Sequence, residues 1–516
     1  MALKKKAKGG GRSRIAIGGS KKGVMFTLLT IILFVLMLAE VITYVVLNNT
    51  YNQQASEASA IIGAGSIVNT LRDGLGPFLA TSVQHAINVY LPAGAQLQYP
   101  LNSTASAALS SLVYNGMING TSYPGMSNAT VMAFASAMEK QASAQSSSMN
   151  IYNSSVRIYQ DSPAYINATY TGLAAINTTY GFFTYPLSIE AGYPVMIAYV
   201  NLTLENMQPA QSPSPFQQMI TFDPAAYNQY ENSDLGNIRF YHGATPLFSW
   251  CESGCSSSAT SATFWVSLPG GIAADSNTTI TMGFMPKNVE YSMAYQSAAT
   301  TPYAGEAPQL SPSYAEYDNG AMVFNFYDNF KGTSLNTSKW SSSGAETIDN
   351  GISISPSQGG DIGTISTFSN PLVTDMYAEF VGPGTSSGGV LSGIWLNSGS
   401  NGGTYFDGWH AAVDCFTGGE WNPSQNWPCF STQPSASTYY VWSIEWLPSS
   451  SADIYYNYGN ALSPTDYSDT STPVNIEITT QGNAVATLYA YWVRERAYPP
   501  GGVMPTVLMG NLVKTK

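Results

Sequence analysis

The residues best suited to ligand chemistry gather in a polar stretch near the C-terminal end of the chain. Residues 401–428 are rich in Gly, Asn and Pro, and three tryptophans stand among them. An indole ring offers an apolar face on which the C–H groups of a sugar stack, while neighbouring amides, carboxylates and imidazoles bind its hydroxyl groups. The candidate carbohydrate-binding residues are Asp407, Trp409, His410, Trp421, Asn426 and Trp427, with Asp414 and Glu420 as further polar groups. The alternative is a packing role, because aromatic loops also plug the ends of sheet domains.

Four cysteines could form covalent links in the same half of the molecule. Their spacing pairs Cys251 with Cys255 and Cys415 with Cys429, and disulfides are the default outside the cell. A zinc site is the alternative for the first pair, but only His242 lies nearby and the usual ligand spacing is not met. A bridge between the second pair would close much of the tryptophan-rich stretch into a stiff loop.

Charged residues are scarce and unevenly distributed. They make up 10% of the chain, against about 25% in ordinary soluble domains. Of the 31 Asp and Glu, only Glu40 precedes residue 48, whereas 8 of the 19 Lys and Arg lie in the first 22 residues. The few basic residues beyond them form no basic patch, which argues against nucleic acid as a partner. A surface this poor in ionisable groups changes charge little in acid, so an acidic habitat is compatible with it.

An unbroken apolar run from Val24 to Leu47 predicts a transmembrane helix. A helix of this length extends about 36 Å at roughly 1.5 Å per residue, enough to cross a hydrocarbon core of about 30 Å. Residues 1–23 form a basic tail, which the positive-inside rule places in the cytoplasm. We therefore predict a single-pass protein of the cell membrane with its C-terminal domains outside.

Two alternatives concern processing of the N-terminus. A cleaved signal peptide has an apolar core of about 7–15 residues and a small-residue cleavage site, whereas this run is longer and ends in Tyr44-Val45-Val46-Leu47. A type IV pilin-like leader is the second alternative, because Lys22-Gly23 directly precedes the run. The glutamate that pilins carry near the start of the mature helix is missing.

Residues 48–192 predict a juxtamembrane α+β domain. Apolar residues at mixed 3–4 spacing predict helix over 55–89, broken at Gly74, Gly76 and Pro77. From residue 150 the period changes to two, which predicts strands. We identify no catalytic group here, and His85 is interpreted as a packed or exposed side chain.

Beyond residue 195 nearly every segment alternates between apolar and polar residues, as in Val200, Leu202 and Leu204. Short alternating strands separated by Gly, Pro and Asn turns indicate antiparallel sandwiches. Residues 291–319, rich in Ala, Ser, Pro and Tyr, predict a linker, and residues 501–516 a C-terminal tail. The fold class predicted is mainly β: a transmembrane helix, an α+β domain and two antiparallel, jelly-roll-like β-sandwiches.

Residues 195–290 resemble the prokaryotic surface module called domain of unknown function 2341. The resemblance lies in the order of five features, which are the strand 195–204, Asp234–Phe240, Leu247–Trp250, Phe264–Pro269 and Thr278–Phe284. Family members read "IRF", a "P-x-W-x-E"-like step, "WVKVP" and "TIYMYYG" in this order. The resemblance implies a surface protein, in particular an archaeal one, but no chemistry.

Residues 320–500 resemble the concanavalin A-like lectin and glucanase sandwiches. The opening Phe326–Phe330 with Trp340, the strand Tyr439–Pro448 and the closing strand Leu488–Arg494 carry the resemblance. It implies carbohydrate recognition, and it makes calcium held by Asp407 and Asp414 an alternative to a site with no metal or cofactor.

Glucanases of this superfamily place carboxylates in an E-x-D-x-E arrangement on one strand, where alternation brings them to one face. Nothing in the chain matches this arrangement. Asp375 and Glu379, four residues apart, come nearest to it. The prediction is therefore a non-catalytic membrane-anchored surface protein for display or adhesion, which recognises surface glycans or contacts other envelope proteins. An extracellular glucanase-type hydrolase and a pilin-like subunit remain the alternatives.

Overall fold

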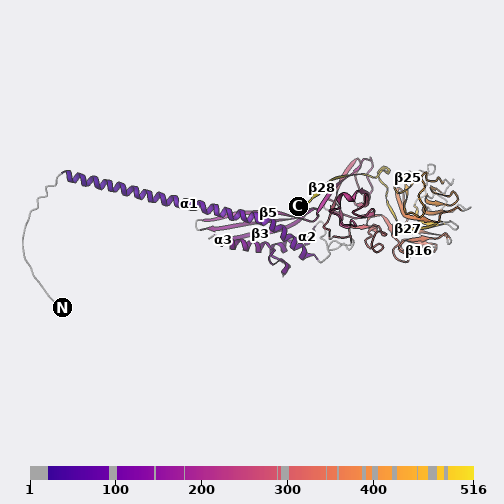
Figure 1. Cartoon of the computed structure of the whole chain (residues 1–516), viewed down its shortest axis with the longest axis horizontal. Coiled ribbons are helices and arrows are strands. Elements are labelled where there is room, and N and C mark those ends of the chain that lie inside the picture. Colours follow the sequence, from indigo (N-terminus) through magenta and orange to yellow (C-terminus); the bar gives the residue numbers. More distant parts are fainter. Residues whose placement is uncertain are drawn as a thin grey trace, which may run out of the picture. The chain divides into compact units, whose positions relative to one another are not determined.

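The protein is described from a computed structural model (Figure 1). The structure describes residues 21–91, 101–144, 147–178, 181–243, 245–287, 289–291, 302–344, 346–356, 359–385, 391–397, 405–420, 427–449, 451–462, 473–480 and 486–515. The chain divides into two compact units. The first contains Met1–Leu75, Phe134–Ser154 and Thr171–Ser188, and the second contains Gly76–Ala133, Ser155–Tyr170 and Ile189–Lys516.

Helix α1 (Lys21–Tyr90) begins within the basic segment and includes the whole apolar run (Figure 1). From Phe26 onward it is long and apolar enough to cross a membrane. Large apolar side chains between Phe26 and Leu47 are exposed, and about half or more of the surface of each is accessible. Such a helix is stable in lipid, since its backbone groups are satisfied internally and its side chains match the hydrocarbon.

The predicted break in this helix is wrong, because α1 continues through Gly74, Gly76 and Pro77. Fully buried leucines at 71, 75 and 79 form a stripe on both sides of the proline. Burial of each contributes roughly 1.5–3 kcal/mol, which together exceeds the roughly 3 kcal/mol cost of an interior proline. His85 is exposed, in agreement with its prediction.

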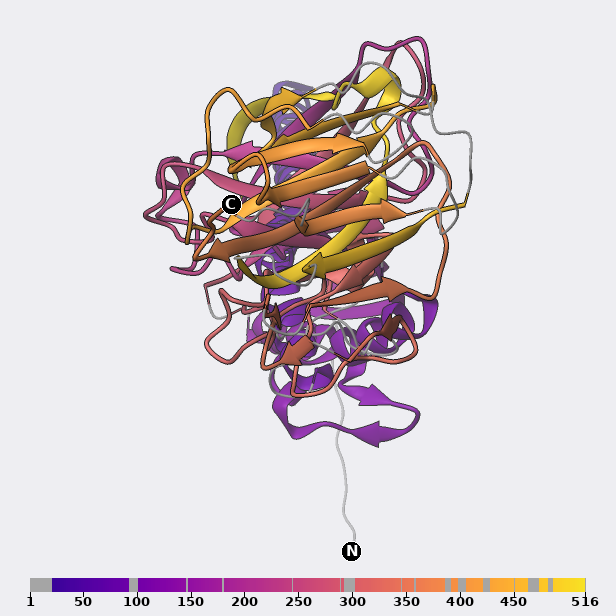
Figure 2. The same cartoon turned by 90° about the vertical axis from the view of Figure 1, so that its right-hand side faces the viewer.

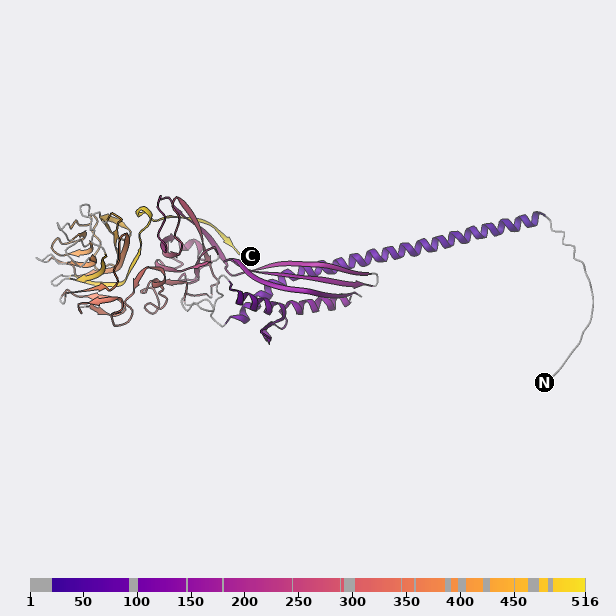
Figure 3. The ribbon, with the colours of Figure 1, turned by 180° about the vertical axis from the view of Figure 1, so that it is seen from behind.

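Shorter elements complete the N-terminal part of the chain. They are α2 (Ser103–Asn115), β1 (Met117–Ile118), β2 (Thr121–Ser122), η1 (Pro124–Met126), α3 (Val131–Ala144), β3 (Ser148–Ser162), β4 (Tyr165–Thr178) and β5 (Gly181–Pro194). The Asn102 side chain caps α2 by accepting the Ala105 N–H bond at 2.7 Å. The three long strands, drawn as arrows in Figure 3, form one sheet in the order β3-β4-β5. Helices followed by a sheet were predicted for this region.

The middle of the chain is a sandwich of a five-stranded and a four-stranded sheet, in the orders β28-β6-β12-β8-β9 and β13-β10-β11-β7. Its elements are β6 (Ala198–Asn206), β7 (Phe216–Phe222), η2 (Pro224–Tyr227), β8 (Ile238–His242), β9 (Thr245–Leu247), β10 (Ser249–Ser253), β11 (Ala262–Leu268), β12 (Ser276–Phe284), β13 (Ala304–Glu306) and β28 (Thr506–Lys514). The predicted alternation is confirmed, since Val200, Leu202 and Leu204 are fully buried between the sheets.

Two segments predicted to be irregular are strands of this sandwich. The expected tail contains β28, which pairs with β6 along Thr506 to Lys514 and packs Val507, Met509 and Leu512 against the core. The expected linker contains β13, which lies parallel to β10. Both strands cover edges whose unpaired backbone groups would otherwise stay open. Their partners lie far away in sequence, so periodicity alone could not reveal the pairing.

The C-terminal sandwich pairs an eight-stranded sheet with a six-stranded one (Figure 2, orange to yellow). The larger sheet has the order β16-β17-β27-β19-β23-β24-β25, with β14 also paired to β27, and the smaller has the order β15-β18-β26-β20-β21-β22. Their elements are β14 (Phe326–Asp328), β15 (Trp340–Ser342), β16 (Glu346–Ile348), β17 (Ile352–Ile354), β18 (Gly360–Thr364), β19 (Leu372–Val381), β20 (Leu391–Asn397), β21 (Tyr405–His410), β22 (Cys415–Glu420), β23 (Tyr440–Trp446), β24 (Ala452–Tyr456), β25 (Gly459–Leu462), β26 (Asn475–Thr480) and β27 (Thr487–Ala497). Trp442, Ile444 and Trp446 fill the core, as their alternation predicted.

The two sandwiches share a second apolar core within the same compact unit. Trp250 and Trp265 of the four-stranded sheet pack with Trp492 of the eight-stranded sheet and with α4 (Gly320–Val323). Arg494 lies at the centre of this layer, and its guanidinium bonds Glu252 at 2.8 Å and Asp375 at 2.7 Å. We call this layer the junction core. Its buried charges are paired, as burial requires.

Candidate functional site

The predicted sugar-binding residues do not form one site, because β21 sends alternate side chains to opposite faces of the six-stranded sheet. Tyr405 and Trp409 belong to the sandwich core. Phe406 belongs to a separate apolar cluster on the outer face, and His410 stacks on Trp427 there. The sequence pattern 405–410 was interpreted as loop, whereas it is a strand with both faces covered.

Trp409 and Asp407 were predicted to bind a ligand, but both side chains are buried in the core of the sandwich. The Trp409 ring packs on Phe416 at 5.1 Å between the two sheets. Asp407 is fully buried and accepts the Ser443 N–H bond of the opposite sheet at 2.9 Å. Burial raises the pKa of Asp407 well above its ordinary value, and its position in the core makes it a structural group.

His410 and Trp427 remain together on the outer face. Their rings lie parallel, 5.3 Å apart, and Trp427 is partly exposed. Trp395 of β20 and Phe406 of β21 support the Trp427 ring edge-on, at 6.3 and 5.9 Å. We call Trp395, Phe406, His410 and Trp427 the outer aromatic cluster. Trp395 and Phe406 were not predicted, although the alternation of β20 is visible in the sequence.

Polar side chains lie beside the outer aromatic cluster on the same face of the six-stranded sheet. Glu477 of β26 lies directly across from Trp395, and both its carboxylate oxygens accept bonds from the Asn397 amide at 2.9 Å. Desolvation raises the pKa of Glu477, with a smaller contribution from Asp361 of β18. These groups offer hydrogen-bond acceptors and an amide next to apolar rings.

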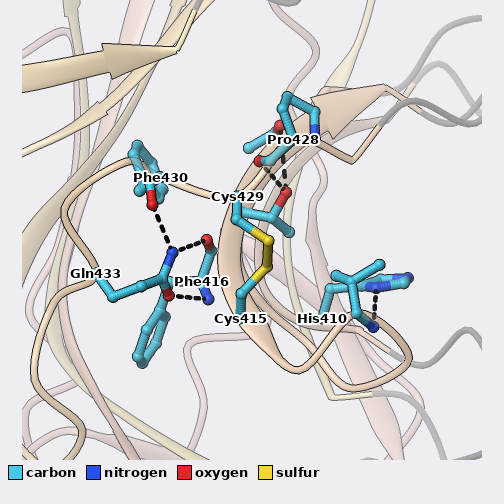
Figure 4. The surroundings of a disulfide bond; sticks show 10 residues. His410, Cys415, Phe416, Pro428, Cys429, Phe430 and Gln433 are labelled. Atoms are coloured by element: carbon cyan, nitrogen blue, oxygen red, sulfur yellow. Dashed lines mark hydrogen bonds between the residues drawn. A yellow bond between two sulfur atoms is a disulfide. The ribbon is translucent and has the colours of Figure 1, made fainter.

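The Cys415–Cys429 disulfide joins the start of β22 to a later segment of the chain (Figure 4). The Thr417 hydroxyl donates to the Pro428 carbonyl at 2.6 Å, one residue after Trp427. On the other side, the Gln433 amide accepts the Phe416 N–H bond at 2.7 Å and donates to its carbonyl at 3.0 Å. The predicted disulfide therefore ties the segment that carries Trp427 to β22.

The protonation of His410 follows from its neighbours. The Val413 N–H group donates to its Nδ1 at 3.3 Å (Figure 4), so the neutral ring carries its proton on Nε2. Burial lowers the pKa of His410. The imidazole is thus a neutral donor at pH 7.

Trp421 and Asn426 lie outside the described residues. Asp414 is exposed in a turn while Asp407 is in the core, so the two do not converge as calcium ligands. Within the described ranges, no group of three or more His, Cys, Asp or Glu could hold a metal. The Cys251–Cys255 disulfide is present at the edge of the middle core.

Asp375 and Glu379 are not an acid pair open to a substrate. Asp375 is fully buried and accepts bonds from Arg494, Arg496 and the Ser443 hydroxyl. Burial raises its pKa, but the two guanidinium groups outweigh burial and lower the pKa below its ordinary value. Asp375 is therefore a structural anion of the junction core.

No protein-family model matches the chain, that of domain of unknown function 2341 included. A stretch of 138 residues is 36% identical to uncharacterized protein 562 of Sulfolobus islandicus rod-shaped virus 1. It covers 26% of this chain and only 22% of that protein.

Solved structures similar to part of the chain include a beta-1,3-glucanase from Mycobacterium marinum, with 12% identity and a TM-score of 0.25. It matches 33% of this chain and 98% of its own. Beta-agarase B from Zobellia galactanivorans has 11% identity and a TM-score of 0.26, and matches 33% of this chain and 90% of its own. Identity this low carries no information on activity.

Proposed function

We propose that this protein is a non-catalytic, membrane-anchored surface protein whose C-terminal sandwich binds neutral carbohydrate at the outer aromatic cluster. The observation that carries the proposal is the partly exposed Trp427 ring, which stacks on His410 and is supported by Trp395, with Glu477 directly across from Trp395 on the neighbouring strand. A partly exposed indole stacks on a sugar ring, and the adjacent polar groups bind its hydroxyls.

Charge favours neutral glycans over acidic ones. Residues 341–493 contain no Lys or Arg, so no cation from these strands is available to an anionic sugar. The carboxylates of Glu477 and Asp361 would repel a uronate or a sulfate group, and a neutral His410 would not attract one by charge. A neutral hexose polymer meets only acceptors, one amide and aromatic rings.

Binding to a glycan array should therefore depend on Trp427. With the full chain in detergent, we expect signals on neutral glycans and an affinity about tenfold lower for Trp427→Ala, the equivalent of roughly 1.4 kcal/mol. Tyr489→Ala is the matched control, because this ring is exposed on the other sheet of the same sandwich.

An array without signals, or one in which Trp427→Ala and Tyr489→Ala behave alike, would remove the proposal. Release of reducing ends from a bound glycan, lost in Glu477→Gln, would assign hydrolysis instead of recognition.

The anchor and its orientation form the second part of the proposal. Helix α1 has the length and composition of a spanning helix, and both disulfides fit an oxidising exterior. We expect the protein to resist a carbonate wash of membranes and its C-terminal part to be cleaved by protease added to intact cells. Protection from that protease would contradict the orientation, and loss of residues 1–23 from the mature protein would favour the pilin-like alternative.

A further inference from the structure

A cleft of about 290 Å³ lies where the two sandwiches meet. None of the residues that line it belongs to the proposed glycan site. Its walls include Trp265 of β11, Glu445 of β23, Asp453 and Tyr455 of β24, and Arg496 of β27. Pro499 and Gly502, in the connection that leads to β28, complete the wall. The volume is at the lower end of the range for small-ligand sites, about 300–1,000 Å³.

Two carboxylates stand side by side in this cleft. Glu445 and Asp453 are direct partners in the β23–β24 register, and directly opposed residues have Cβ atoms roughly 5 Å apart. Glu445 Oε1 is buried and has no hydrogen-bond partner among the described residues. A buried acceptor without a donor costs free energy. A ligand that donates a hydrogen bond to Glu445 Oε1 would remove this cost.

The cations around the cleft are already engaged. Arg496 donates from Nε to Asp375 at 2.9 Å and from Nη2 to the Tyr455 hydroxyl at 3.1 Å. Arg494, next to it, is paired with Glu252 and Asp375. Around the cleft, the four acids Glu252, Asp375, Glu445 and Asp453 thus outnumber the two guanidinium groups.

We propose that this cleft binds a primary ammonium group, supplied by an amino sugar or by a lysine side chain. An ammonium group has three N–H donors and no acceptor, which matches the open Glu445 acceptor and the carboxylate opposite to it. The Trp265 ring and the side chains of Met219 and Met504 line the cleft beside the acids and accommodate the carbon atoms next to the amine. A divalent cation fits less well, since no group of three acidic, His or Cys residues occurs in the described part of the chain.

Binding should strengthen as pH rises from 6 to 8. Desolvation raises the pKa of Glu445 to about 7, Arg496 opposes this, and Asp453 and Asp375 add to it. Tyr455 and Tyr498 are the other titratable groups that interact with Glu445, and the pKa of each is raised above 10. Glu445 is thus the group that gains charge in this range, and the ammonium ligand keeps its own.

The test is calorimetric titration of the full chain in detergent with two matched pairs of probes. Glucosamine is compared with glucose, and Nα-acetyl-lysine methylamide with its norleucine counterpart. We expect at least one ammonium probe to bind, its neutral counterpart to bind about tenfold or more weakly, and Glu445→Gln to lower the affinity about tenfold. Glu379→Gln, on the same sheet outside the cleft, is the control and should leave binding unchanged.

The two probes identify the source of the amine, and either one supports the proposal. Because glutamine removes a buried acid without changing its shape, the thermal midpoint of Glu445→Gln at pH 8 should equal or exceed that of the parent, which confirms folding. The proposal is overturned if neither ammonium probe binds, or if binding persists in Glu445→Gln. Loss of binding in Trp427→Ala would place the ligand at the outer aromatic cluster instead, which keeps failure here separate from failure of the proposed glycan site.

Discussion

Replacing Arg494 by leucine is expected to lower the free energy of unfolding by about 3–5 kcal/mol, the usual cost of removing one partner from a buried ion pair. The guanidinium bonds Glu252, Asp375 and the Tyr458 hydroxyl, at 2.8, 2.7 and 2.6 Å. Its removal leaves Glu252 with only the neutral Trp265 and Tyr458 donors, and Asp375 with Arg496 as its remaining cation.

Packing adds to this expected loss. The Arg494 guanidinium lies over the rings of Trp265, Phe324 and Trp492, each about 4.5 Å from its centre. Cation–π contacts in a desolvated site contribute up to about 2 kcal/mol. Leucine fills part of the volume but makes no such contact.

Urea unfolding followed by tryptophan fluorescence measures the effect, since three buried tryptophans, Trp250, Trp265 and Trp492, belong to the junction core. Arg157→Leu is the matched control: Arg157 contacts only the Tyr159 ring among the interactions described, and its change should cost less than about 1 kcal/mol. A loss below about 1 kcal/mol for Arg494→Leu would show that the two sandwiches do not depend on this ion network.

Stability is expected to increase as pH falls from 8 to 5, the reverse of the behaviour of most proteins in this range. Desolvation raises the pKa of Glu231 to about 8, and those of Glu306 and Glu495 to about 7. In the unfolded chain these groups ionise near pH 4.5. Between that value and the raised pKa, the folded state binds more protons than the unfolded state, so each unit of rising pH lowers the free energy of unfolding.

The expected effect is large because several acids act together. One group raised from 4.5 to about 7 contributes up to roughly 3 kcal/mol. Two groups oppose the trend: burial lowers the pKa of His410, which favours the unfolded state below about pH 6.5, and the paired Asp375 loses its contribution in strong acid. We expect a net gain of several kcal/mol at pH 5 relative to pH 8.

Thermal unfolding of the full chain at pH 5, 6.5 and 8 measures this trend. Glu231→Gln should stabilise the protein at pH 8 much more than at pH 5, because both Glu231 oxygens are buried without a hydrogen-bond partner in the described structure. Glu57→Gln, at an exposed position, should change neither value. A thermal midpoint that rises with pH would show that these acids are ionised in the folded state. The trend would suit the acidic habitat with which the composition is compatible.

Local pattern was sufficient to predict much of the fold. The apolar run predicted the exposed part of α1, and period-two alternation predicted the strands β6, β11, β12 and β23 and the residues that they bury. The disulfides followed from spacing and compartment. These features depend on neighbours a few residues apart, so the sequence contains them directly.

The sites were predicted less well, because a strand can be read from its alternation but the layer that covers each face cannot. Trp409 and His410 are adjacent in sequence, yet one is core and the other lies on the outer face. Asp375 resembled half of a catalytic pair until Arg494 and Arg496, about 120 residues later, proved to neutralise it.

By itself, the sequence determined the long apolar helix, the mainly β architecture, the acidic character and the cysteine pairs, because each depends on composition or short-range periodicity. Only the tertiary structure decided that β28 closes the middle sandwich, that Trp395 and Phe406 support Trp427, and that Glu445 meets Asp453 in a cleft where the two sandwiches meet. These outcomes depend on contacts between distant segments. Their free energy comes from burial and pairing, which exist only once the sheets have stacked.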